Sequence, residues 1–178
     1  MSIGSVLPLR VEDLPEGDGP RMEIVDGSLH VTPAAGIVHQ LLVGELAAQL
    51  RTHAPVGWLV LPGGNLLRRG STDRLLIPDV LVVEDSVLEG DAIYMDPSDA
   101  LLVVEVESPS TRSVDRLLKR ELYAQWRVPH YWVVDPQART VDRLALTPQR
   151  DYAPAAGEQG WLVDVDVDAV WRRVSRSS

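Results

Sequence analysis

Two acidic residues interrupt the most apolar stretches of this 178-residue sequence. Asp79 lies directly after a proline inside the aliphatic run 75–83, and Glu105 lies inside a second run, 101–106. Each run is predicted to form a buried strand, where an unpaired carboxylate is strongly destabilising. Its charge needs a partner, which is either a divalent cation with oxygen ligands or a basic side chain. The helix predicted to follow supplies a candidate basic residue, Lys119.

This pair of carboxylates suits metal-dependent hydrolysis of a phosphodiester. If the two predicted strands are neighbours, Asp79 and Glu105 project toward one spot where Mg²⁺ would bind. A cation there polarises the scissile phosphate and lowers the pKa of an attacking water. Lys119 would orient that water or stabilise the developing phosphorane charge. A spacing of four residues puts Asp115, Lys119 and Tyr123 on one face of the predicted helix.

The surrounding pattern predicts the elements that must position these residues. Apolar segments on either side of Asp26-Gly27 predict a hairpin, because this dipeptide adopts positive φ at low cost. Apolar residues at helical spacing predict helices over 37–50 and 114–126. The two aliphatic runs read as central strands covered on both faces. Further short strands are predicted at 58–61, 65–67, 130–134 and 140–146, and the segment 161–171 closes the domain.

The order of these elements predicts the fold class. Strands that alternate with helices indicate an α/β fold, with a central mixed β-sheet flanked by helices. Residues 1–20 contain three prolines and three glycines and are expected to form a flexible N-terminal arm. Residues 21–178 are then expected to form a single domain, which is an ordinary domain size.

Composition excludes several classes of protein. Hydrophobic residues make up 45% of the chain, so extensive disorder is not expected. No apolar run approaches the roughly 20 residues of a membrane span, and no signal-like segment or cysteine is present, so a cytoplasmic location is the simplest expectation. The net charge of −9 argues against a broad basic surface that coats nucleic acid. It does not argue against a metal-dependent nuclease, because bound cations reverse the local field.

The residues around the two carboxylates also resemble a known family. The ordered set comprises Pro78-Asp79, the segment 104–111, the helical residues Asp115, Lys119 and Tyr123, and the segment 128–135. It is similar to the Uma-two family of restriction-endonuclease-like proteins, which belongs to the PD-(D/E)xK nuclease superfamily. The similarity extends upstream to the segment 23–27 and His39, so it covers roughly residues 20–145.

The resemblance implies a restriction-endonuclease-like fold and Mg²⁺-dependent cleavage of DNA, with Mn²⁺ able to substitute. It implies that Asp79 and Glu105 are metal ligands and that Lys119 is the catalytic lysine. Glu107 stands where the superfamily ordinarily has a lysine, two residues after Glu105. Because alternate residues of a strand share a face, Glu107 is a candidate third ligand or a partner of Lys119.

Two further candidates and an assembly follow from the same resemblance. Glu23, in the predicted hairpin, and His39, in the first predicted helix, are candidate auxiliary site residues. Nucleases of this fold that cut both strands of DNA commonly need two active sites, so a homodimer is expected.

Plainer interpretations of the same residues stay open. Asp79 could cap the end of a strand, and Lys119 could pair on a solvated helix with an acid four residues earlier, a contribution of only about 0.2–0.5 kcal/mol. Glu23 could be a surface residue, and His39 a structural one. Two other functions also stay open: a catalytically inactive nuclease-fold module that binds DNA or protein, and a metal-dependent hydrolase of a small phosphorylated substrate.

Overall fold

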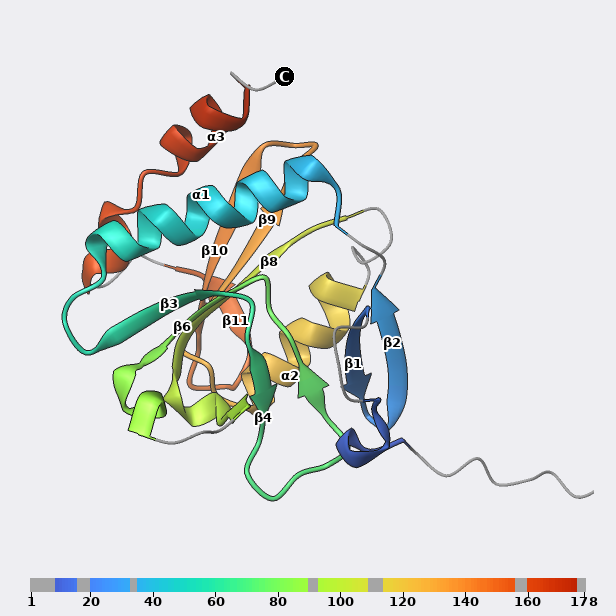
Figure 1. Ribbon diagram of the computed structural model, residues 1–178. Helices are drawn as coiled ribbons and strands as arrows, with labels where there is room; N and C mark the ends of the chain where they lie inside the picture. Colours follow the sequence, from blue (N-terminus) through green and yellow to red (C-terminus); the bar gives the residue numbers. More distant parts are fainter. Residues whose placement is uncertain are drawn as a thin grey trace, which may run out of the picture.

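The computed structural model of the chain describes residues 9–15, 20–32, 35–89, 93–108, 114–155 and 160–175. Two β-sheets with helices packed against them make up this part of the chain (Figure 1). The larger sheet has six strands, in the order β11 (Tyr152–Pro154), β10 (Thr140–Leu146), β9 (His130–Asp135), β8 (Ala100–Val106), β6 (Val80–Glu84) and β3 (Trp58–Pro62). Strands β8 and β9 run parallel and the other neighbours run antiparallel, so the predicted mixed sheet is confirmed.

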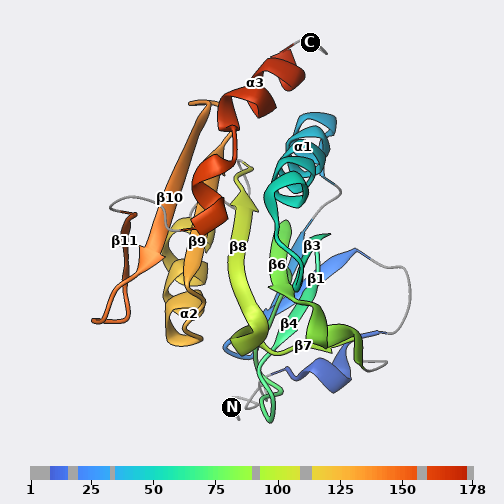
Figure 2. The ribbon, with the colours of Figure 1, turned by 90° about the vertical axis from the view of Figure 1, so that its left-hand side faces the viewer.

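The smaller sheet contains the predicted hairpin. Its strand order is β2 (Ser28–Thr32), β1 (Arg21–Val25), β5 (Leu75–Leu76), β4 (Asn65–Leu67) and β7 (Tyr94–Met95). Asp26 and Gly27 join β1 to β2 with φ angles of 48° and 74°, the positive values that the dipeptide predicted. Pairing of β1 with β5 brings this hairpin beside the larger sheet (Figure 2).

Helices cover both faces of the larger sheet. On one face, α1 (Ile37–His53) buries Leu42, Leu46 and Leu50, and α3 (Val167–Ser175) lies alongside it (Figure 1). On the other face, α2 (Arg120–Gln125) buries Leu122 and Tyr123. A π-helix, η4 (Val114–Lys119), leads directly into α2, so the helix predicted over 114–126 is present with a wider first turn. The short 3-10 helices are η1 (Val11–Asp13), η2 (Asp85–Glu89), η3 (Pro97–Asp99) and η5 (Gly160–Asp164).

One prediction about the strands was wrong in detail. The aliphatic run 75–83 does not form a single strand, because it divides into β5 in the smaller sheet and β6 in the larger sheet. Pro78 lies at the break, where its missing N–H and fixed φ interrupt a ladder of backbone hydrogen bonds. As a result, Asp79 stands at the junction of the two sheets rather than inside a strand.

The predicted N-terminal arm is only partly described, since residues 1–8 and 16–19 lie outside the described ranges. The part that is described packs against the hairpin. Val11 is buried with Ile24 and Leu75, and the N–H of Leu9 donates to the carbonyl of Gly27. No helix in the described part of the chain has both the length and the apolar character needed to cross a membrane.

Candidate active site

The alternation of side chains along β8 decides where Glu105 points. Leu102 and Val104 belong to the core beneath α1, whereas Val103 belongs to the core beneath α2. Glu105 therefore follows Val103 onto the α2 face. Strands β6 and β8 are antiparallel, and Val80 pairs with Val104. Asp79, one residue before Val80, therefore lies beside Glu105, one residue after Val104.

Glu105 meets two residues of the helix that covers it. One oxygen, Oε1, lies 3.0 Å from Lys119 Nζ and accepts a hydrogen bond of 2.7 Å from the Tyr123 hydroxyl. The predicted spacing of four residues is what lets both side chains reach the same carboxylate. Glu105 is 1% exposed and Lys119 is 3% exposed, so this contact is shielded from water.

Lys119 also links the two sheets. Its Nζ lies 3.0 Å from Oε1 of Glu23, which comes from β1 in the smaller sheet. The same oxygen of Glu23 accepts a hydrogen bond of 2.7 Å from the backbone N–H of Ile77. One ammonium group thus bridges two buried carboxylates that are far apart in the sequence.

Asp79 is held by three donors. Its Oδ2 accepts a hydrogen bond of 2.7 Å from the backbone N–H of Val106 and lies 3.2 Å from Nε2 of His39, on α1. Its Oδ1 lies 2.6 Å from Nη1 of Arg21, the first residue of β1. Asp79 is 6% exposed, so these donors replace most of the water that would otherwise solvate its charge.

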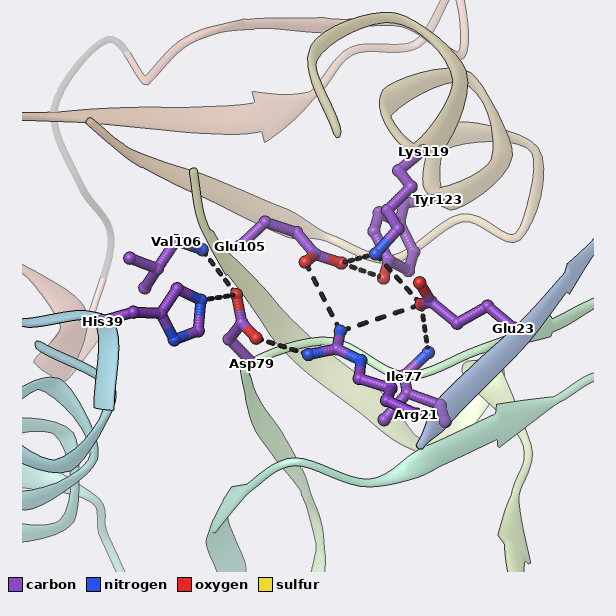
Figure 3. A network of polar contacts seen from close by, with 9 residues as sticks. All are labelled: Arg21, Glu23, His39, Ile77, Asp79, Glu105, Val106, Lys119 and Tyr123. Carbon is purple, nitrogen blue, oxygen red and sulfur yellow. Dashed lines mark hydrogen bonds and ion pairs between the residues drawn. The ribbon is translucent and has the colours of Figure 1, made fainter. Parts of the chain in front are cut away.

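Arg21 is the central cation of the arrangement (Figure 3). Besides its bond to Asp79, its Nη2 lies 3.8 Å from both Glu23 Oε1 and Glu105 Oε2. We call Glu23, Asp79 and Glu105 the acid cluster, since all three carboxylates face this one guanidinium. Both sheets and two helical segments contribute to the site, so its residues, from Arg21 to Tyr123, lie far apart in the sequence.

These contacts shift the pKa values of Asp79, His39 and Tyr123. Burial raises the pKa of Asp79, but the hydrogen bond from His39 and the charge of Arg21 outweigh it, and the pKa falls to about 2. The hydrogen bond to Asp79 raises the pKa of His39 above 6.5. Burial, together with the charge of Glu105, raises the pKa of Tyr123 well above its usual 10. Asp79 is therefore ionised at neutral pH, and Tyr123 acts there as a hydrogen-bond donor.

The low pKa of Asp79 makes a prediction about acid stability. A folded pKa of about 2, against 3.8 for an ordinary aspartate, stabilises the fold above about pH 4 and stops doing so as the pH falls through about 2. The shift corresponds to roughly 2 kcal/mol. Asp79→Asn lacks this pH-dependent stabilisation. The difference in free energy of unfolding between wild type and the variant should therefore shrink by roughly 2 kcal/mol between about pH 5 and about pH 2. Urea denaturation at a series of pH values measures it, and a gap that does not change with pH contradicts the low pKa.

Five of the six candidate residues lie together in the structure. Asp79, Glu105, Lys119, Glu23 and His39 come together in one network of polar contacts (Figure 3). Glu107 is buried, and its backbone N–H donates to the carbonyl of Val134, but the network in Figure 3 does not include it.

Arg21 is the site residue that the sequence analysis missed. A signal for it existed, because Arg21 directly precedes the first predicted strand of the hairpin and lies two residues before Glu23, so an extended chain puts both on one face. A second signal that the sequence analysis did not use supports a specific role for Lys119. It is the only lysine among the 17 lysine and arginine residues of the chain.

The donor atoms of the acid cluster fit a hard divalent cation by type. Carboxylate oxygens are the ligands that Mg²⁺ prefers, and three of these groups face a single position. In the described part of the chain, however, no group of three or more His, Cys, Asp or Glu side chains is arranged to hold a metal ion as it stands. The guanidinium of Arg21 lies among the oxygens that would have to converge.

Comparison with solved structures identifies the class of fold. The chain aligns with a crystal structure described as a "putative nuclease" from Anabaena variabilis, with a TM-score of 0.73 over 94% of this chain and 99% of that one. The two sequences are 14% identical, so this likeness concerns the fold. The expected nuclease-like architecture is thereby confirmed.

The family follows from the sequence. Residues 9–172 match the model of the Uma-two (Uma2) family, described as "Putative restriction endonuclease". The chain belongs to this family, and the resemblance found from the residues is confirmed. No curated protein matches the chain.

Proposed function

We propose that this protein is a metal-dependent endonuclease that hydrolyses DNA phosphodiester bonds at the acid cluster. The observation that carries the proposal is the convergence of Asp79, Glu105 and Lys119, from three separate segments of the chain, at one buried spot. Membership in a restriction-endonuclease family supports a nucleic-acid substrate. Buried charges in such numbers are costly for a fold, and a catalytic role accounts for their presence.

Each residue has a distinct role in this proposal. Asp79 and Glu105 would hold Mg²⁺, with Glu23 beside them as a further oxygen donor. Held there, Mg²⁺ would polarise the scissile phosphate and lower the pKa of the attacking water. Lys119, 3.0 Å from Glu105, would orient that water or stabilise the charge that develops on the phosphate oxygens.

The remaining polar groups position these residues. The Tyr123 hydroxyl fixes the rotamer of Glu105 through its hydrogen bond of 2.7 Å. The backbone N–H of Val106 fixes Asp79 in the same way. His39, 3.2 Å from Asp79, supplies a further hydrogen bond from α1 and keeps that carboxylate ionised.

Incubation of supercoiled plasmid with the purified protein tests this function. We expect nicked or linear product with Mg²⁺ or Mn²⁺ and none with EDTA. Linear product formed without accumulation of nicked circles would support the homodimer, because two sites then act in one encounter. Asp142→Asn, which removes an exposed carboxylate on β10, serves as a charge-matched control and should cleave as wild type does. Absence of cleavage with either ion contradicts the proposal.

A catalytically inactive module that binds DNA or protein is the second candidate. The observation that favours it is Arg21, which already neutralises part of the acid cluster without any metal. Under this alternative, the charges are a structural network and the chain binds a partner by another surface. A protein that retains DNA in a filter-binding assay, but neither cuts it nor binds Mn²⁺, would support the module over the enzyme.

A further inference from the structure

Arg21 lies where a cation of the acid cluster would lie. Its guanidinium contacts Asp79 at 2.6 Å and approaches Glu23 and Glu105 at 3.8 Å. These are the three carboxylates whose oxygens would ligate a divalent ion. A guanidinium and a divalent ion would compete for Asp79, the carboxylate that Arg21 contacts directly.

The balance of charge leads to the same conclusion. Arg21 and a divalent cation are both positive, so holding both among the same three carboxylates would add their mutual repulsion in a buried place. Exchanging Arg21 for the divalent cation avoids that repulsion.

The side chain of Arg21 is held less completely than that of Lys119. Its Nε is buried without a hydrogen-bond partner, and its Nη2 contacts are long. Its side chain is 26% exposed, whereas that of Lys119 is 4% exposed and lies 3.0 Å from two carboxylates. Because its side chain is partly exposed, Arg21 can turn toward solvent once another cation compensates Asp79, and its contact of 2.6 Å with that carboxylate is the one that must break.

We propose that Arg21 is an internal counter-ion, which neutralises the acid cluster in the metal-free protein and withdraws when a divalent cation binds. The inference rests on the proposed function, since it concerns how the catalytic metal enters. In this role, Arg21 changes the affinity of the acid cluster for metal without being a metal ligand. Removal of Arg21 should therefore tighten metal binding instead of weakening it.

The affinity for Mn²⁺ tests this inference without any activity assay. Because Lys119 is the only lysine, protein labelled with ¹³C-lysine gives a single side-chain signal that lies within the cluster. Paramagnetic broadening of this signal during a Mn²⁺ titration reports binding at the cluster and not elsewhere. The titration compares wild type with Arg21→Gln and with Arg172→Gln, which removes an exposed arginine on α3. It also includes Arg21→Lys, which keeps the charge; this variant has a second lysine signal, so its titration follows the signal that it shares with wild type.

We expect Arg21→Gln to bind Mn²⁺ at least about tenfold more tightly than wild type, because binding to wild type must first break the ion pair between Arg21 and Asp79, which the variant lacks. Arg21→Lys and Arg172→Gln should stay within about threefold of wild type. The melting temperature gives a second readout. Mn²⁺ should raise the melting temperature of Arg21→Gln more than it raises the melting temperature of wild type. If Arg21→Gln is unfolded without metal, Mn²⁺ should fold it, and failure to do so contradicts the inference.

The outcomes separate the inference from the function on which it rests. Equal affinity of wild type and Arg21→Gln for Mn²⁺, or weaker binding by the variant, overturns the counter-ion role while the metal site stands. If neither protein shows broadening of the Lys119 signal, the metal site itself is absent, and the proposed nuclease function fails together with the inference.

Discussion

Replacing Asp79 with asparagine should lower the rate of metal-dependent DNA cleavage by about a thousandfold or more. The carboxylate is the proposed ligand that joins the metal to the junction of the two sheets, and its loss removes a full negative charge from the ion. A metal acting as a Lewis acid contributes several kcal/mol of transition-state stabilisation. Loss of about 4 kcal/mol of it corresponds to roughly a thousandfold in rate.

The asparagine variant is a sharp test because it keeps the shape of the side chain. Its amide oxygen can still accept the hydrogen bond from the Val106 N–H, so the local backbone should hold. Cleavage rates of Asp79→Asn and of the control Asp142→Asn are compared on the same plasmid, with circular dichroism to verify that both are folded. Asp79→Asn cleaving within about tenfold of wild type would show that the reaction takes place elsewhere.

The second large effect concerns stability. Lys119→Met should lower the free energy of unfolding by about 3 kcal/mol or more, because it leaves Glu105 and Glu23 buried without their shared ammonium. Arg172→Met, which breaks an exposed ion pair with Asp166, should cost no more than about 1 kcal/mol. Urea denaturation of both variants measures the two changes.

A double variant separates the ionic contact from lost packing. Glu23→Gln removes one of the two carboxylates that lose their contact with an ammonium group in Lys119→Met, so the two changes together should cost less than their sum by at least about 1 kcal/mol. Strict additivity would mean that Lys119 stabilises the fold by packing alone. It would also weaken the case that its ammonium is held in place for chemistry.

Local features of the sequence predicted much of the fold. The Asp26-Gly27 turn, the apolar spacing of α1 and the aliphatic character of β8 each depend on residues close together in the chain. The position of Glu105 beneath Lys119 and Tyr123 was also open to prediction. It needs only the alternation of a strand and the repeat of a helix.

Other features depend on tertiary contacts that no local pattern encodes. The run 75–83 looks like one strand because its residues are uniformly apolar, yet Pro78 divides it between two sheets. Arg21 and Glu23 reach the site only because β1 pairs with β5, through Ile24 and Leu75. The sequence shows that buried carboxylates need a cation, and only the three-dimensional arrangement shows that an arginine already supplies one.

The most direct test of the whole account is a crystal of the protein soaked in Mn²⁺, examined by anomalous diffraction. The account predicts one strong peak bound by Asp79 and Glu105, close to Glu23, with the guanidinium of Arg21 turned away from the acid cluster. A crystal with no peak at these carboxylates, and with Arg21 still bonded to Asp79 at a high Mn²⁺ concentration, would contradict it.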